Sequence, residues 1–237
     1  MSSQSFKFKQ FEVFHNRCAM KVGTDGVLLG AWVARQFTNM QPQNILDIGT
    51  GSGLIALMLA QQFKEAEIIG IDIDDSAIEQ ATFNFAQSAW SKRLTAKKTD
   101  FTTFMPQRQF ELIVSNPPYF SRSLKNPDQQ RALARHNDSL PYKDLVRHTM
   151  KDLLSDNGVF AIIIPYEQEE TILDISSDYN ITDICHIRTY IAKPYKRTII
   201  ALTNSNIQDK HISELTLEDP DHSRSREYAE LTTAYYL

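Results

Sequence analysis

The sequence predicts an α/β fold with a mostly parallel central sheet, helices on both of its faces and an antiparallel edge strand. From residue 44 onward, short apolar runs alternate with longer segments of helical spacing. The run VFAIIIP at 159–165 has almost no polar residue, which is typical of a strand covered on both faces. We expect one domain, in which residues 1–41 form an N-terminal extension and residues 42–237 form the core.

The spacing of apolar residues predicts the individual elements in chain order. Residues 6–14 alternate Phe with Lys at first and predict a short strand or hairpin. A helix is expected at 27–37, with Thr24 or Asp25 as its N-cap. In the core, strands are expected at 45–48, 67–73, 94–100, 110–115 and 159–165, and helices at 54–63, 76–89 and 141–158. The last of these helices is expected to stop at Gly158.

The region after the last core strand supplies the antiparallel part of the predicted sheet. Residues 181–191 and 196–204 are two apolar runs separated by a short connection. Parallel strands need a longer crossover, so these two strands are expected to form a hairpin that carries the antiparallel edge.

Composition excludes several classes of protein. The two cysteines, Cys18 and Cys185, lie far apart and lack the His/Cys spacing of a zinc site, so we expect no disulfide framework and no metal. No apolar signal core opens the chain, and no apolar run is long enough to cross a bilayer. We therefore expect a cytoplasmic protein without a membrane partner. A net charge of -4 is unusual for a nucleic-acid binder, although one loop of an RNA requires only a local basic face.

A glycine-rich turn joins the first core strand to the first core helix. The turn reads DIGTGSG, with Gly49, Gly51 and Gly53 spaced as G-x-G-x-G and Asp47 just before them. Glycines let the backbone turn sharply and approach a ligand closely. The carboxylate of Asp47 would repel a pyrophosphate and attract an ammonium group, which favours S-adenosylmethionine over a dinucleotide.

Acidic residues also stand at the ends of the next two strands. Asp72 is placed to accept hydrogen bonds from both ribose hydroxyls of the cofactor, and Ile73 offers an apolar face to its adenine. Asp100 is placed to accept from the adenine amine, with Phe101 packing alongside. The alternative is that these acids only cap helices.

The tetrapeptide Asn116-Pro117-Pro118-Tyr119 follows the fourth core strand directly. An aryl amine such as adenine N6 is a weak nucleophile, because its lone pair is delocalised into the ring. The Asn116 side-chain oxygen and the Pro117 carbonyl are two rigidly held acceptors for its two N–H groups, while Tyr119 stacks on the base. The tetrapeptide therefore predicts methylation of a planar amine next to the cofactor. Its alternative is a rigid turn with an exposed tyrosine.

With this tetrapeptide and the glycine loop, the chain resembles class I methyltransferases, which have a Rossmann-like fold. The stretch Phe11–Trp32, which contains MKVGTDGVLLGAW, and the ending YAELTTAYYL make it similar to the bacterial tRNA(Val) (adenine-N6)-methyltransferase family. This resemblance implies methylation of adenosine 37, the base 3′ to the anticodon. We expect a monomer, because no obligate protein partner is evident in the sequence. The resemblance also implies that Lys21, Thr24 and Asp25 lie near the cofactor.

Two groups of basic residues are candidates for contacts with tRNA. They are Arg122, Lys125, Arg131, Arg135 and His136 in the first group, and Lys193, Lys196 and Arg197 in the second. We expect the first group to contact phosphates in a segment that becomes ordered on binding. The alternative is a solvated lid with internal salt bridges to Asp128 and Asp138.

Three other activities are compatible with parts of the pattern. A protein glutamine amide presents the same two N–H groups, but enzymes of that type usually carry a separate helical N-terminal domain. Adenine-N6 methylation of DNA or rRNA uses the same chemistry, although no target-recognition domain for DNA is evident. A non-enzymatic RNA-binding module would need neither the acids nor the tetrapeptide.

Overall fold

The computed structural model describes residues 4–16, 22–118, 142–207 and 209–237. The strands are β1 (Ser5–Lys7), β2 (Glu12–Phe14), β3 (Asn44–Ile48), β4 (Glu67–Asp72), β5 (Leu94–Lys98), β6 (Phe110–Ser115), β7 (Leu154–Pro165), β8 (Asn180–Arg188), β9 (Arg197–Thr203) and β10 (His211–Thr216). The α-helices are α1 (Thr24–Gln36), α2 (Leu54–Gln62), α3 (Asp75–Gln87), α5 (Tyr142–His148), α6 (Glu169–Ile175) and α7 (Arg226–Thr232). Short helical turns are η1 (Ser91–Arg93), η2 (Phe101–Thr103), η3 (Thr149–Leu153) and η4 (Tyr166–Gln168).

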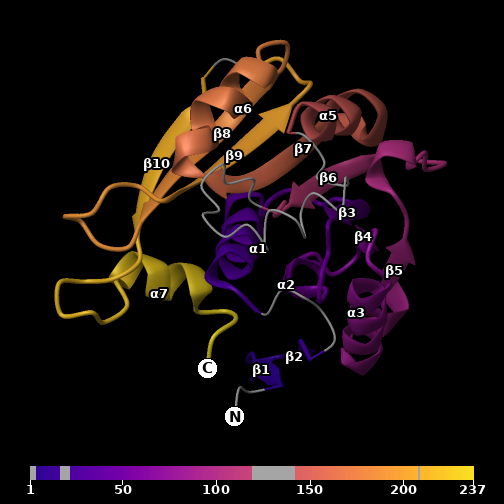
Figure 1. Cartoon of the computed structure of the whole chain (residues 1–237), viewed down its shortest axis with the longest axis horizontal. Coiled ribbons are helices and arrows are strands. Elements are labelled where there is room, and N and C mark those ends of the chain that lie inside the picture. Colours follow the sequence, from indigo (N-terminus) through magenta and orange to yellow (C-terminus); the bar gives the residue numbers. More distant parts are fainter. Residues whose placement is uncertain (1–3, 17–21, 119–141, 208) are drawn as a thin grey trace, which may run out of the picture.

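A mixed eight-stranded sheet with the order β10-β8-β9-β7-β6-β3-β4-β5 runs through the molecule (Figure 1). Neighbouring strands from β7 to β5 are parallel, and so are β10 and β8. Strand β9 runs against both β7 and β8. The predicted α/β class with an antiparallel strand pair is confirmed. The reversed strand β9 lies inside the sheet, between β7 and β8, and the strand at the edge is β10, which is parallel to β8.

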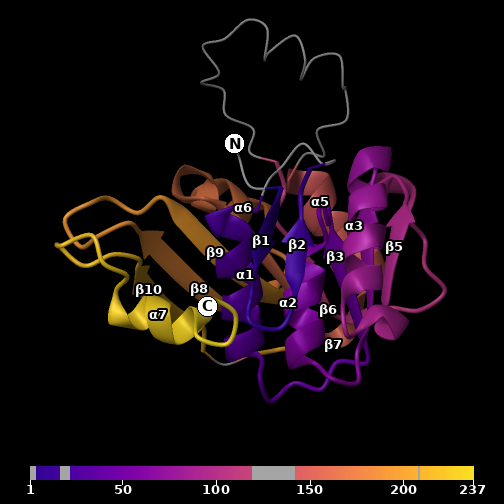
Figure 2. The ribbon, with the colours of Figure 1, turned by 90° about the horizontal axis from the view of Figure 1, so that it is seen from below.

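Helices cover both faces of the sheet (Figure 2). Each face has its own cluster of buried side chains. Helices α1, α2, α3 and α7 pack on one face, and α5 and α6 pack on the other. The strands alternate between these clusters as a pleated sheet requires, so that Leu112 and Val114 of β6 face α1 and α2 while Ile113 faces α5.

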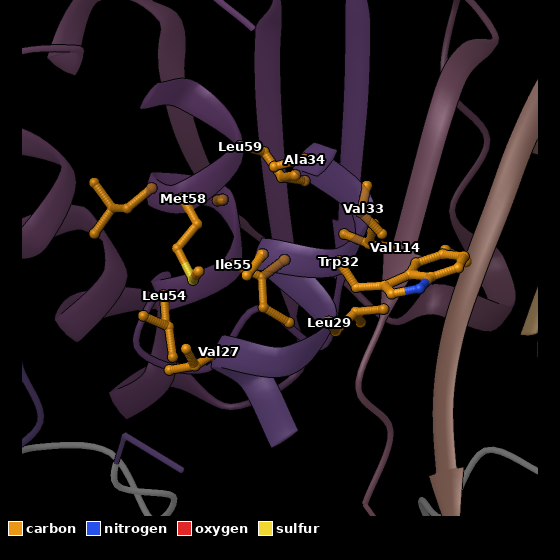
Figure 3. Packing of buried hydrophobic residues seen from close by; sticks show 14 of the residues in the cluster. Val27, Leu29, Trp32, Val33, Ala34, Leu54, Ile55, Met58, Leu59 and Val114 are labelled. Atoms are coloured by element: carbon orange, nitrogen blue, oxygen red, sulfur yellow. The ribbon is translucent and has the colours of Figure 1, made fainter. Parts of the chain in front are cut away.

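Helix α1 packs closely on α2, and Figure 3 shows Val27 of α1 beside Leu54 of α2. A Cβ added to Gly30 would lie 2.7 Å from Met58 Sδ, and one added to Gly26 would lie 3.1 Å from Leu54 Cδ2. A side chain at either position would force Met58 or Leu54 to shift, so the two glycines favour this close approach of the helices. Since Leu54 directly follows the glycine loop, the first turn of α1 is held beside that loop.

The N-terminal residues form the predicted hairpin, in which β1 and β2 pair antiparallel. The hairpin packs on the C-terminal end of the chain, where the ring of Phe8 stacks on Tyr236 with centroids 5.9 Å apart. Lys9 Nζ donates to the carbonyl of Thr233 at 2.6 Å. Phe8 and Phe11 belong to the same buried cluster as α1 and α2.

Two local predictions were wrong. Helix α1 begins at Thr24 with Gly23 as N-cap, so neither Thr24 nor Asp25 caps it; the Asp25 carboxylate is bound to Arg197 instead. The helix predicted to reach Gly158 ends at η3, and β7 already begins at Leu154. Gly158 lies within a bulged part of β7, where a Cβ would lie 3.0 Å from the carbonyl oxygen of Glu111.

Candidate active site

The carboxyl ends of neighbouring strands bring the predicted site residues to one edge of the sheet. In the register of β3, Ile48 lies opposite Ile71 of β4 and Ser115 of β6. The glycine loop, Asp72 and Asn116 directly follow these three positions. They therefore lie side by side at the edge where open α/β sheets bind their ligands.

The glycine loop is held from behind and open in front. Gly49, Gly51 and Gly53 all have positive φ values, 72°, 54° and 82°, which L side chains adopt only with strain. The backbone N–H groups of Gly49 and Thr50 donate to the carbonyl of Ile71 at 2.9 and 3.0 Å. A Cβ added to Gly49 or Gly51 would meet no atom within 4 Å, so a ligand can approach the loop backbone there.

Asp47 lies beneath this loop and is 0% exposed. Its Oδ2 accepts hydrogen bonds from Thr50 Oγ1 at 2.7 Å and from the Ala56 N–H at 3.3 Å. Its Oδ1 has no hydrogen-bond partner among the described residues. Burial raises the pKa of Asp47 to about 7; the negative charge of Asp72 also raises it, and the two hydrogen bonds lower it. A buried carboxylate oxygen that lacks a donor suits a cationic ligand group, and this contact stays a prediction.

The carboxylate of Asp72 braces the loop and remains partly exposed. Its Oδ2 accepts from the Gly51 N–H and its Oδ1 from the Asp74 N–H, both at 3.0 Å. Each carboxylate oxygen retains a second acceptor site. Ile73 is 48% exposed beside it and offers an apolar surface. Both side chains fit the predicted contacts with a ribose and an adenine.

Asp100 and Phe101 are engaged in local structure at the end of β5. Asp100 Oδ1 accepts from the N–H of Thr102 at 2.8 Å and from its Oγ1 at 2.7 Å, and thereby caps η2. Phe101 is buried and its ring meets that of His148 edge-on, with centroids 5.0 Å apart. The capping alternative therefore holds for Asp100. A contact of either residue with the cofactor stays a prediction.

The end of β6 presents Asn116, which is partly exposed, followed by buried Pro117 and exposed Pro118. Ser115 Oγ donates to the carbonyl of Ile48 at 3.0 Å and ties this strand end to the start of the glycine loop. The first three residues of the tetrapeptide thus lie next to the loop. Their catalytic roles remain predictions.

An ion pair at the first turn of α1 joins a residue predicted to lie near the cofactor to a residue predicted to contact RNA. Arg197, a predicted RNA contact at the start of β9, donates from Nε to Asp25 Oδ2 at 3.0 Å. Asp25 and Thr24, predicted to lie near the cofactor, form the first turn of α1. The pair connects the β9 side of the edge to the helix that packs beside the loop.

The two remaining described residues of the second basic group differ in their surroundings. Lys193 Nζ lies 5.5 Å from the ring centroid of Tyr190. Lys196 is exposed at the end of the loop between β8 and β9. The other sequence-based assignments lie outside the described residues: Lys21, Tyr119, Arg122, Lys125, Arg131, Arg135 and His136.

The chain was compared with known proteins. A family model described as a methyltransferase domain matches residues 41–218. Proteins named tRNA1(Val) (adenine(37)-N6)-methyltransferase are 46% identical in Bacteroides thetaiotaomicron and 43% identical in Christiangramia forsetii, with 100% of this chain and 99% of each relative covered. The chain belongs to this methyltransferase family. A relative of the same name in Flavobacterium johnsoniae is 40% identical over 98% of this chain and 99% of its own length.

Solved structures show the same fold at low sequence identity. A predicted O-methyltransferase from Agrobacterium tumefaciens has a TM-score of 0.69 and 18% identity, covering 89% of this chain and 96% of its own. P. horikoshii TYW2 in complex with MeSAdo has a TM-score of 0.61 and 14% identity, covering 86% and 74%. The Rossmann-like class expected from the resemblance is thereby confirmed.

Sequence reasoning missed part of this edge. Arg188, Thr189 and Glu218 line a groove beside Asp25 and Arg197. The wall of the groove after β10 could not be foreseen, because the sequence HISELT of this strand has only two apolar residues and gave no clear strand signal.

No helix in the described ranges is long and apolar enough to span a membrane. The same ranges contain no group of three His, Cys, Asp or Glu side chains able to hold a metal ion.

Proposed function

We propose that this protein transfers the methyl group of S-adenosylmethionine to N6 of adenosine 37 in a valine tRNA. The observation that carries the proposal is the position of Asn116 and Pro117 beside an open glycine loop, in a chain 46% identical to a protein named for this reaction. A likeness over almost the full length of both chains supports the assignment of the substrate as well as the chemistry.

The cofactor is assigned to the edge formed by the ends of β3, β4 and β5. Gly49 and Gly51 present open backbone to its methionine part, and Asp72 accepts hydrogen bonds from its ribose. Ile73 covers one face of the adenine. Asp47 holds the loop through Thr50 and balances the ammonium group by its negative charge. When bound, the cofactor supplies an electrophilic methyl group on a sulfonium.

Asn116 and Pro117 prepare the attacking amine. The side-chain oxygen of Asn116 and the carbonyl oxygen of Pro117 each accept one N–H of the adenine amine. This turns the lone pair of the nitrogen out of conjugation and toward the methyl group. Both acceptors are preorganised, because Ser115 fixes the strand end and proline restricts the backbone. The amine loses its proton after the methyl has been transferred, so no strong general base is required.

The remaining site residues are assigned to the same reaction. Tyr119 stacks on the flipped adenine, and Lys21 and Thr24 lie near the cofactor. Contacts with tRNA phosphates are assigned to seven of the basic residues that the sequence singled out: Arg122, Lys125, Arg131, Arg135, His136, Lys193 and Lys196. Arg197, the eighth, is bound to Asp25 and is assigned to the wall of the site.

Transfer of labelled methyl from S-adenosylmethionine to unmodified bulk tRNA tests the proposal. Duplex DNA, rRNA and a release-factor protein serve as competing acceptors in parallel reactions. We expect label in tRNA alone. Label only in the release factor would identify a glutamine methyltransferase, and label in DNA or rRNA would keep the chemistry and replace the substrate. Cofactor binding without transfer to any acceptor would indicate a non-enzymatic binding module.

A further inference from the structure

A second hollow lies on the same edge of the sheet as the glycine loop. It is a groove of about 380 Å³ between the first turn of α1 and the ends of β8, β9 and β10. Leu28 lines it from α1, Thr189 from the end of β8, Lys196 and Arg197 from the start of β9, and Glu218 from the segment after β10. This volume lies within the range of small-ligand sites, and the lining is mostly polar.

Both arginines that line the groove are held in ion pairs. Arg197 is bound to Asp25, and Arg188 Nη2 lies 2.7 Å from Glu214 Oε2. Glu218 Oε2 lies 3.4 Å from His222 Nδ1. Lys196 has no ion-pair partner among the residues that the structure describes, and it is an exposed residue in the lining of the groove. The groove therefore presents one available positive charge.

The backbone around this lysine is fixed although its side chain is exposed. The Lys196 N–H donates to the carbonyl of Ile187 at 2.8 Å, and its own carbonyl accepts from the Tyr166 N–H at 3.1 Å. The same carbonyl accepts from Arg197 Nη1 at 2.9 Å. A cation on an anchored backbone loses less conformational freedom on binding an anion than one on a mobile loop.

The groove is near enough to the candidate active site to act on the same substrate. Its α1 wall begins at Thr24 and Asp25, and Gly26, the next residue, packs on Leu54 beside the glycine loop. Strand β9 lies two strands from β6, which ends next to Asn116. At the usual strand spacing this separation is roughly 10 Å. A single-stranded RNA segment that places its adenine at Asn116 can therefore reach the groove with a neighbouring nucleotide.

We propose that this groove holds the sugar-phosphate of a nucleotide next to the target adenine, and that Lys196 binds its phosphate. The inference rests on the proposed function, because it requires that RNA is the substrate. Arg197, which the sequence grouped with Lys196, forms the wall of the groove through Asp25 and is not a free phosphate ligand. Lys196 is thus a binding residue that acts on the affinity for tRNA and not on the chemical step.

Steady-state methylation of an unmodified tRNA transcript at several salt concentrations tests the inference. Lys196→Ala is expected to raise KM for tRNA about five- to tenfold, with kcat and the Kd for S-adenosylmethionine unchanged. The slope of log KM against log salt should fall by about one, as for the loss of one phosphate contact. Lys196→Arg should restore most of the affinity. Thr189→Trp, which fills the groove without changing charge, should raise KM by a similar factor.

Lys92→Ala is the matched control, because Lys92 is an exposed lysine before the amino end of β5, on the opposite edge of the sheet. Its KM and salt slope should equal those of the wild type. An unchanged KM in Lys196→Ala, or an equal rise in Lys92→Ala, would overturn the inference. If KM for tRNA rises in Lys196→Ala but not in Thr189→Trp, the phosphate lies outside the groove, and this result would also overturn the inference. If the wild type transfers no methyl to tRNA, the proposed function itself fails.

Discussion

Two halves of one sheet edge are built differently. The half formed by β3, β4 and β5 is shaped mainly by backbone groups. Three glycines with positive φ form the loop, and Asp72 accepts hydrogen bonds from main-chain N–H groups of this region. On the half formed by β7, β9, β8 and β10, side chains from distant parts of the chain meet. Asp25 and Arg197, for example, are 172 positions apart.

This difference matches two separate functions, cofactor binding in the first half and substrate binding in the second. A site made of backbone and local contacts suits a ligand that is always the same, such as a cofactor. A site made of side chains on strand ends and loops suits a macromolecular substrate. Asn116 lies at the boundary, directly after β6, which is the strand between the two halves. Variants in each half should therefore change different constants.

Asn116→Ala has the largest expected effect, because it removes an acceptor that orients the amine. We expect kcat to fall roughly 100- to 1000-fold, by analogy with removal of one preorganised hydrogen-bonding group from a catalytic site. The Kd for S-adenosylmethionine, measured by calorimetry, should change little. A variant with near-normal kcat would remove Asn116 from the mechanism.

Asp72→Ala should act on the cofactor half alone. It removes the acceptor for the ribose and the brace of the Gly51 N–H, so Kd for S-adenosylmethionine should rise roughly 10- to 100-fold. The KM for tRNA, measured at saturating cofactor, should remain within about twofold of the wild type. An unchanged cofactor Kd would contradict the ribose assignment. A large rise in the KM for tRNA would contradict the separation of the two halves.

Asp47→Asn should alter how stability depends on pH. The pKa of Asp47 is about 7 in the folded protein and has an ordinary value of 3.8. Between these values the folded state holds a proton that the unfolded state has lost, so the free energy of unfolding falls as pH rises toward 7. Asparagine cannot ionise. The stability of the variant relative to the wild type should therefore rise by about 2 kcal/mol from pH 5.5 to 8.

Urea unfolding of the ligand-free protein at both pH values measures this difference. A stability difference for Asp47→Asn that is the same at both pH values would show that the Asp47 carboxyl does not titrate in this window.

The smallest effect is expected for the ion pair between Asp25 and Arg197. The side chains are 23% and 29% exposed, so solvent weakens their attraction. A double-mutant cycle with Asp25→Asn and Arg197→Gln should give a coupling of about 0.5–1 kcal/mol in urea unfolding. Because the pair joins the two halves, Arg197→Gln should also weaken cofactor binding slightly. If the two single substitutions change the free energy of unfolding additively, the two halves are not coupled through this ion pair.

Much of the cofactor half was predictable from sequence because its signals are local. The glycine spacing, the acid after β4 and the tetrapeptide after β6 each follow a strand that the apolar pattern reveals. Local reasoning also placed Asp100 correctly at a strand end, although the structure shows that it caps η2. The sequence pattern did not show that Asp47 would be covered by its own loop.

The substrate half was less predictable because its contacts are long-range. Nothing in the sequence around Thr24 indicates that Asp25 will bind Arg197, and the local pattern favours helix capping for these residues. Strand β10 has little apolar character, because it lies at the edge of the sheet with much of its surface exposed. Without it, the groove beside Lys196 has no third wall and could not be foreseen.

One measurement tests the central claim most directly. Two transcripts of a valine tRNA are incubated with the protein and S-adenosylmethionine, one with adenine at position 37 and one with guanine there, and their nucleosides are analysed by mass spectrometry. The account predicts N6-methyladenosine in the first transcript, none in the second, and none in either with Asn116→Ala. Methylation of both transcripts, or of neither, would contradict it.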